Sequence, residues 1–287
     1  MKDVDAFLSG LPAEDTTPLV GDWLVEPVTR KTSLGRSVDG ASTVSLNNGL
    51  IRRAFSLAPN GATVAFDNLL TDQAILRGVS PEARVSVNGT ELDVGGLEGQ
   101  TQYGYLRREW VEQMTSAPGA LQLVGIDSGE TQAPFPWRRC RHHADLPWPA
   151  PGVRLSMRYT ASTSPVAVTV HYEMYDAVPV LVKWLEITNV SDGPVQINRF
   201  CVEVLAVVDY ESCVEGQKGW PYPTLHVESD YAFHGMTAAS ADVTTNWLPD
   251  PRYTSQVNYQ LQSPLLLETS PPLGPDVELP AAETLTS

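Results

Sequence analysis

Hydrophobic and polar residues alternate along several short stretches of this chain. In VRLSMRYT, residues 153–160, apolar side chains occupy the odd positions and polar side chains the even positions. Successive side chains of a strand point to opposite faces, so this period of two predicts a half-buried strand. VAVTVHYEMYD, residues 166–176, repeats the pattern. VLVKWLEITNV (180–190) and VQINRFCVEVLAVVD (195–209) are apolar on both faces over part of their length, which favours central strands covered by a second sheet.

Turn residues separate these stretches. ASTVSLNNGLIRRAFSLAPNGATVAFDNLL, residues 41–70, places Asn-Gly and Pro-Asn-Gly between short apolar runs. ARVSVNGTELDV, residues 83–94, predicts the sharpest hairpin, because Asn88 and Gly89 tolerate the positive φ that a two-residue hairpin turn requires. The SDGP turn at 191–194 joins the two most apolar stretches.

Helical periodicity is confined to YGYLRREWVEQM, residues 103–114. Three of its side chains can form a short apolar stripe: Tyr105, Trp110 and Met114. Many short strands with so few helices predict an all-β fold, a large antiparallel β-sandwich with few short helices. We place this domain at residues 41–287. Residues 1–40 are rich in Pro, Asp, Thr and Ser, and we expect them to form an irregular lead-in along it.

Composition narrows the classes of function. The chain has 287 residues, which suits one main all-β domain, and a formal net charge of -15, which argues against nucleic acid as a partner. It shows no export signal and no apolar stretch long enough to span a bilayer, so we expect a cytoplasmic protein without a membrane partner. The three cysteines, Cys140, Cys201 and Cys213, lack CxxC or zinc-ligand spacing, and we expect buried free thiols. No GxSxG, HExxH, phosphate-loop or dinucleotide motif occurs, and we expect no cofactor.

The segment QKGWPYPTLHVESDYAF, residues 217–233, contains the most metal-like residues. In an extended chain His226, Glu228 and Asp230 share one face, and His234 follows closely. This spacing is unspecific, and a solvated strand face or the edge of a substrate site explains it as well. We therefore predict no metal site.

Basic residues gather in PWRRCRHHADLPWP, residues 136–149. The segment holds Arg138, Arg139, Arg141, His142 and His143, flanked by Trp137 and Trp148. Guanidinium and imidazole groups can bind anions or sugars beside aromatic faces. An interface with another domain or subunit is an equal alternative, because Trp and Arg are favoured there.

Several strings resemble, in order, the N-terminal domain of glycoside hydrolase family 36, the α-galactosidase group. The resemblance runs from about Ser42 to Glu283. The strings are LNNGLIRRAF, PNGATVAFDNLL, VSPEARVSVNGTELDVGGL, VLVKWLEITN, QKGWPYPTLHVESDYAF and NYQLQSPLLLETSPPLGP. The resemblance implies a β-supersandwich of the galactose-mutarotase-like type. In the family this domain precedes a catalytic (β/α)₈ barrel. In the family both catalytic aspartates lie on the barrel, the nucleophile in a Lys-x-Asp motif that these 287 residues do not contain.

The resemblance therefore implies a non-catalytic domain that supports a barrel in cis or in trans, and we carry over no catalytic residue. It also implies an aromatic wall for a galactoside pocket. Trp220 and Tyr222 can present apolar faces to a sugar, while prolines stiffen their loop. Trp247 and Tyr253 are the exposed candidates of a second loop, NWLPDPRYTSQVNY. Trp220 can equally be a packing anchor at a domain interface. We also expect self-association as a homo-oligomer, because a sandwich without its barrel exposes apolar surface.

Two alternatives differ in class. The chain can be a stand-alone mutarotase-like or lyase-like enzyme, in which His171 and Glu173, two residues apart and on one strand face, act as acid and base. It can also be a free carbohydrate-binding module, for which Trp220 is again the candidate. The sequence is compatible with a fragment, a truncated gene or a stand-alone relative of the domain.

Overall fold

The computed structural model describes residues 3–19, 21–138, 140, 146–208, 225–231, 243–255, 259–261 and 265–287. Within these residues the regular structure is mostly antiparallel β-sheet, with two short helices, α1 (Val4–Ser9) and α2 (Arg108–Val111). This confirms the prediction of an all-β protein. Among the described residues no helix is long and apolar enough to cross a membrane.

Four larger sheets organise the strands. Sheet A has the order β11 (Gln122–Glu130), β12 (Gly152–Thr160), β13 (Val166–Tyr175), β14 (Leu181–Asn189), β20 (Thr284–Thr286). Sheet B has the order β1 (Ser33–Arg36), β2 (Thr43–Asn47), β3 (Ile51–Ser56), β4 (Ala62–Asn68), β5 (Gln73–Ala74). Sheet C has the order β17 (Thr245–Leu248), β18 (Leu266–Thr269), β16 (Glu203–Val207), β6 (Leu76–Gly78). Sheet D has the order β19 (Pro275–Leu279), β15 (Val195–Cys201), β7 (Ala83–Val87), β8 (Thr90–Val94). A short pair joins β9 (Leu97–Glu98) to β10 (Thr115–Ser116).

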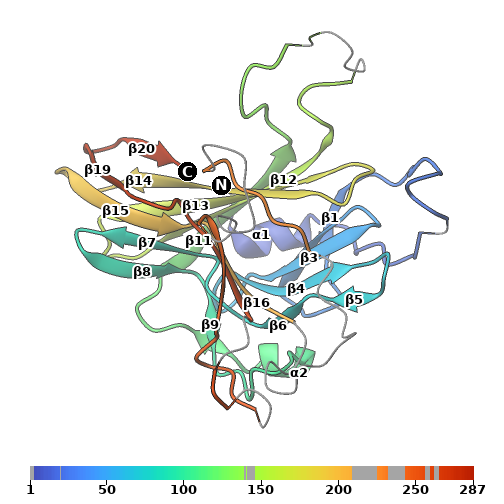
Figure 1. Ribbon diagram of the computed structural model, residues 1–287, viewed down its shortest axis with the longest axis horizontal. Helices are drawn as coiled ribbons and strands as arrows, with labels where there is room; N and C mark the ends of the chain where they lie inside the picture. The colour runs from blue at the N-terminus through green and yellow to red at the C-terminus, as the bar shows by residue number, and fades with distance from the viewer. Residues whose placement is uncertain are drawn as a thin grey trace.

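One face of sheet A packs against sheets B and D, as Figure 1 shows for the two layers. The main core joins Tyr172 of β13 to Phe55 of β3 and Val85 of β7, among other buried side chains. A smaller core lies between sheets B and C and includes Phe66 and Leu205. The chain is therefore a layered antiparallel sandwich, with sheet A as one layer.

Local predictions match the structure where they rest on strict alternation. In β12 the side chains of Leu155, Met157 and Tyr159 are fully buried, as the period of two requires. The hairpin of β7 and β8 turns at Asn88 (φ 51°) and Gly89 (φ 78°), the left-handed pair expected of its turn.

Three expectations need correction. The outer face of β14, which we define as the face turned away from the core, is partly exposed at Val182 and Glu186, so β14 is not covered on both faces by the described residues. The predicted helix is a single turn, α2, and Tyr105 is exposed, although Met114 is buried in a small cluster against sheet B. The lead-in also has regular structure, because β1 pairs with β2 and α1 inserts Phe7 into the main core.

Candidate functional site

The aromatic residues predicted to bind sugar fall into two groups. Trp220 and Tyr222 lie outside the described residues, as does His234. Trp247 stands in β17, 37% exposed, while its backbone pairs with Leu267 of β18. Tyr253 is 8% exposed, so the expectation that it lies at the surface is wrong. Sugar contact by any of these side chains stays a prediction.

Tyr253 is buried because an arginine pair holds its loop. The guanidinium of Arg77 lies 5.0 Å from the centre of the Tyr253 ring and donates to Asp250 Oδ2 at 2.9 Å. Arg252 donates to Asp250 Oδ1 at 3.1 Å and to the carbonyl of Val79 at 2.9 Å. Burial alone raises the pKa of Asp250, but the hydrogen bonds and charges of the two arginines outweigh it and hold that pKa below its ordinary value. This loop is thus fixed onto the sandwich.

The most metal-like cluster faces solvent. His226 and Glu228 are both exposed, and Nε2 of the histidine lies 2.9 Å from Oε1 of the glutamate. Asp230 is exposed as well, and the intervening residues are half-buried, which gives the predicted alternation without a sheet partner among the described residues. Within those residues no group of three or more His, Cys, Asp or Glu side chains is placed to hold a metal ion.

The cysteines are unlike in exposure. Cys140 is exposed, so the expectation of a buried thiol is wrong there. Cys201 is partly buried, and burial raises the pKa of its thiol to about 12. Cys213 lies outside the described residues.

His171 and Glu173 share the outer face of β13, as their spacing predicts, but they are not partners. Nδ1 of His171 lies 2.8 Å from Ser156 Oγ, and its ring stacks on Trp184 with centroids 4.7 Å apart. Its carboxylate neighbour is Glu186, at 3.3 Å from Nε2. Burial lowers the pKa of His171, which keeps the imidazole neutral more readily than in water.

Glu173 is held by the connection that follows β11. It accepts from the backbone N–H of Gln132 at 2.7 Å and from the hydroxyl of Tyr175 at 3.2 Å. Burial raises the pKa of this carboxyl. Because Nε2 of His171 and the Glu173 side chain are both buried, neither group is presented to a sugar. The geometry does not favour acid–base catalysis by this pair.

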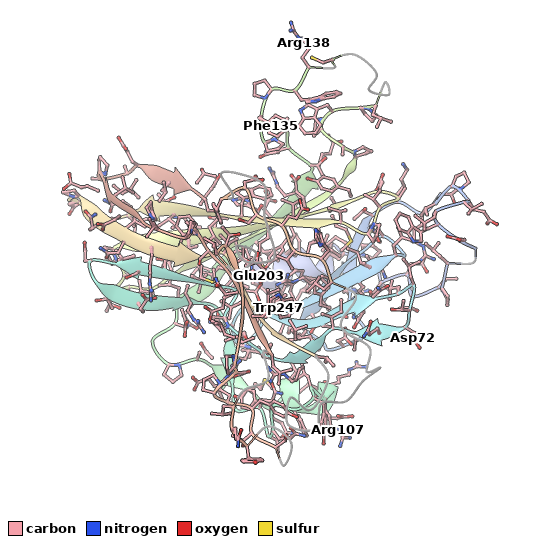
Figure 2. All side chains as sticks on the ribbon, viewed as in Figure 1. Asp72, Arg107, Phe135, Arg138, Glu203 and Trp247 are labelled. Atoms are coloured by element: carbon pink, nitrogen blue, oxygen red, sulfur yellow. The ribbon has the colours of Figure 1, made fainter. Side chains whose placement is uncertain are left out.

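A buried ionic network lies where the sheets meet, and the sequence analysis missed it. Arg53 of β3 donates to Glu203 of β16 at 2.6 Å, and Lys183 of β14 donates to the other oxygen of Glu203 at 2.7 Å. Glu82, just before β7, lies 3.9 Å from Arg53 and accepts from the Tyr172 hydroxyl. Figure 2 labels Glu203 near the middle of the molecule.

Two cations and two carboxylates therefore balance one another inside the core. Burial alone raises the pKa of Glu203, but Arg53 and Lys183 outweigh it and lower that pKa to about 2. Burial lowers the pKa of Lys183 in spite of Glu203. The network joins strands from all four larger sheets or their ends, and among the described residues the side chain of Arg53 is buried. Its role is to fix the sheets relative to one another.

A signal for the network was present in the sequence. Arg53 and Lys183 interrupt apolar runs, in LIRRAF and VLVKWL, where a charge requires a buried partner. The partners themselves cannot be read from local patterns, because Glu203 lies 150 positions from Arg53.

One surface hollow, of about 430 Å³, is lined by charged side chains, among them Arg84, Glu91, Asp93 and Arg199. Both arginines are already paired, Arg84 with Asp93 at 3.2 Å and Arg199 with Glu91 at 2.8 Å. No aromatic side chain is among the described residues that line it. No family model and no curated protein matches the sequence of this chain, so its family stays a prediction from the resemblance.

Proposed function

We propose that this chain is a non-catalytic β-sandwich domain of an α-galactosidase-like hydrolase of glycoside hydrolase family 36. In this proposal it has the galactose-mutarotase-like supersandwich fold and supports a catalytic (β/α)₈ barrel, in cis or in trans. Its exposed free thiol, Cys140, fits a reducing compartment, and we propose the cytoplasm.

One observation carries the proposal: three strings of the resemblance contribute residues to the same buried cluster. LNNGLIRRAF contains Arg53, VSPEARVSV contains Glu82, and VLVKWLEITN contains Lys183. These three residues belong to the buried ionic network. Such a meeting of distant strings in one buried cluster is what the proposal expects if the strings encode the core of one domain.

A second contact supports the same conclusion. Asn48, also within LNNGLIRRAF, donates to the carbonyls of Tyr175 and Val178, both at 2.8 Å. The side-chain oxygen of Asn48, Oδ1, accepts from the backbone N–H groups of Leu50 and Ile51. This fully buried amide therefore ties the β2–β3 turn to the connection between β13 and β14.

The chemistry of the described acids favours a supporting role. A retaining glycosidase needs two carboxyl groups about 5 Å apart that face the sugar. Glu82, Glu203 and Asp250 are acids of the interior, and each lies beside an arginine or lysine inside the protein. Such acids stabilise the fold and are not available to attack or protonate a glycosidic bond.

The proposal includes an aromatic wall for a galactoside, for which Trp247 and Trp220 are the two candidates. Trp247 keeps an exposed face for a sugar or for the barrel. Trp220 is the other candidate, as a sugar platform or as an interface anchor. Tyr253 is better suited to packing, because Arg77 covers its ring.

Calorimetric titration of the chain with the separately produced barrel of a family 36 relative tests the proposal. We expect a one-to-one complex of micromolar or tighter affinity. Trp220→Ala distinguishes the two roles of that residue: an anchor loses affinity for the barrel, whereas a sugar platform keeps it and loses affinity for the galactoside. Absence of complex formation at high micromolar concentration would count against a supporting domain. Millimolar galactoside bound by the chain alone would instead favour the carbohydrate-binding module.

A further inference from the structure

Three Asn-Gly pairs occur in the sequence, at 48–49, 60–61 and 88–89, and each stands between two consecutive strands. Asparagine is chemically labile when a glycine follows it, because glycine has no side chain to keep its backbone nitrogen away from the asparagine amide. The structure places the three pairs in different surroundings. Asn48 and Asn60 are 0% and 1% exposed, whereas Asn88 and Gly89 both lie at the surface. The fold therefore separates three pairs that are equivalent as sequence motifs.

The side-chain amide of Asn60 is fully engaged inside the protein. Its Nδ2 donates to the carbonyl of Leu121 at 3.2 Å and to Ser116 Oγ at 3.3 Å. Its Oδ1 accepts from the backbone N–H groups of Leu123 at 2.8 Å and Gly61 at 2.9 Å. The Gly61 nitrogen, which would have to attack the Asn60 side chain, is thus already committed as a hydrogen-bond donor.

Asn48 is held in the same way. The four hydrogen bonds of its amide join it to backbone groups of Leu50, Ile51, Tyr175 and Val178. The N–H of the following residue, Gly49, donates to Asn47 Oδ1 at 2.7 Å. A reaction at either buried pair would have to break several buried hydrogen bonds at once, which is costly because groups left unpaired in the interior are also desolvated.

The amide of Asn88 makes fewer contacts, at the tip of the hairpin of β7 and β8. Its Oδ1 accepts from the backbone N–H of Gln196 at 2.8 Å, but its Nδ2 has no hydrogen-bond partner among the described residues. The N–H of Gly89 donates to Asn198 Oδ1 at 2.8 Å, in an exposed contact. Asn88 also lines a surface hollow of about 200 Å³ together with Thr90, so water reaches its side chain. The tip can open locally without disturbing the core.

We propose that Asn88 is the site at which the folded chain deamidates. The backbone nitrogen of Gly89 attacks Cγ of Asn88, and the new N–C bond closes a succinimide ring. The bond between Cγ and Nδ2 breaks, and ammonia leaves with the hydrogen that the Gly89 nitrogen carried. Water then opens the ring at either carbonyl group, which gives aspartate or isoaspartate at this position. This inference concerns the chain alone and does not depend on the proposed hydrolase role.

The reaction changes the hairpin turn. Both products put a carboxylate in place of the neutral amide and so add one negative charge to the formal net charge of -15. Isoaspartate also adds a methylene group to the main chain of a two-residue turn that pairs Val87 with Thr90. We therefore expect the hairpin to loosen from β15, which holds the turn through Gln196 and Asn198.

Incubation of the folded chain in heavy-oxygen water, followed by digestion at acidic pH and mass spectrometry, tests the proposal. Heavy oxygen enters when water opens the ring, so it marks deamidation that occurred during the incubation. We expect Asn88 to deamidate at least about tenfold faster than Asn48 or Asn60, because each buried hydrogen bond that must break adds to the barrier. In urea the three pairs should react at similar rates. Equal rates in the folded chain, or an Asn88 that reacts only in urea, would overturn the proposal.

Asn198→Ala tests whether the contacts of the turn control the rate. It removes the acceptor of the Gly89 N–H, so Asn88 should deamidate about fivefold faster. Asn246→Ala is the matched control, because Asn246 is also a half-buried asparagine but lies in β17 of sheet C. Thermal melting will show that both variants fold. A rate at Asn88 that Asn198→Ala leaves equal to that of Asn246→Ala would overturn the structural basis of the proposal.

Discussion

Glu203→Gln is the sharpest perturbation of the buried network. It keeps the shape of the side chain but removes the negative charge that faces both Arg53 and Lys183. The two cations are then left with Glu82 as their one nearby carboxylate among the described residues. Removing one partner of a buried pair usually destabilises by about 3–5 kcal/mol, because the remaining charge is desolvated without compensation.

The pKa of Glu203 gives a second estimate of the folding free energy that the Glu203→Gln variant loses. It falls from 4.5 to about 2 in the folded protein. One pKa unit corresponds to about 1.4 kcal/mol, so this lowering contributes about 3 kcal/mol to folding. The contribution is fully present above the unfolded pKa and is lost as the pH falls from about 4.5 towards 2. The loss expected for a broken buried ion pair and the loss calculated from the pKa therefore agree.

Urea unfolding followed by tryptophan fluorescence measures the effect. At pH 7 we expect Glu203→Gln to lower the free energy of unfolding by about 3 kcal/mol, and we expect the difference from wild type to shrink below pH 4.5. Glu91→Gln is the control, because its pair with Arg199 is largely exposed and should contribute less than about 1 kcal/mol. The reasoning fails if Glu203→Gln loses no more than Glu91→Gln, or if its deficit is the same at pH 7 and pH 3.

Two further predictions concern glycines and thiols. Gly89→Ala should destabilise the protein by about 1 kcal/mol in thermal melting, because a φ of 78° is unfavourable for alanine. The loss should not be larger, since no atom lies within 4 Å of the added Cβ. Gly61→Ala should destabilise by about 2 kcal/mol or more, because its Cβ would clash with the buried hydroxyl of Tyr159, and equal losses for the two variants would contradict this account. Cys140 should react with iodoacetamide within minutes at pH 8, whereas Cys201 should react only on unfolding, because burial raises its thiol pKa to about 12. Peptide mapping distinguishes the two sites, and rapid labelling of Cys201 in the folded chain would show that its thiol is more accessible than described.

The local sequence pattern was sufficient to predict individual strands and tight turns. The alternation of β12 and the Asn-Gly turn after β7 depend only on neighbouring residues, and both appear in the structure as expected. The placement of strands in layers was not predictable in this way. β14 and β15 follow each other across the SDGP turn but belong to different sheets, because that turn passes between layers.

The candidate site depended even more on contacts between distant residues. Tyr253 belongs to a polar, proline-containing loop that suggests exposure, yet Arg77 from β6 covers it. His171 and Glu173 share a face, as their spacing predicts, but Trp184 and Glu186 on the neighbouring strand determine what His171 contacts. Long-range pairing of this kind leaves only an indirect mark on the sequence, a charge or histidine inside an apolar stretch.

The most direct test of the central claim is hydrolysis of an aryl α-galactoside by the purified chain, alone and mixed with the barrel of a family 36 relative. The account predicts no hydrolysis by the chain alone and a higher rate for the barrel when the chain is added. Hydrolysis by the chain alone would contradict it, because two catalytic carboxyl groups would then have to lie within a sandwich in which the interior acids Glu203 and Asp250 are paired with arginine and lysine.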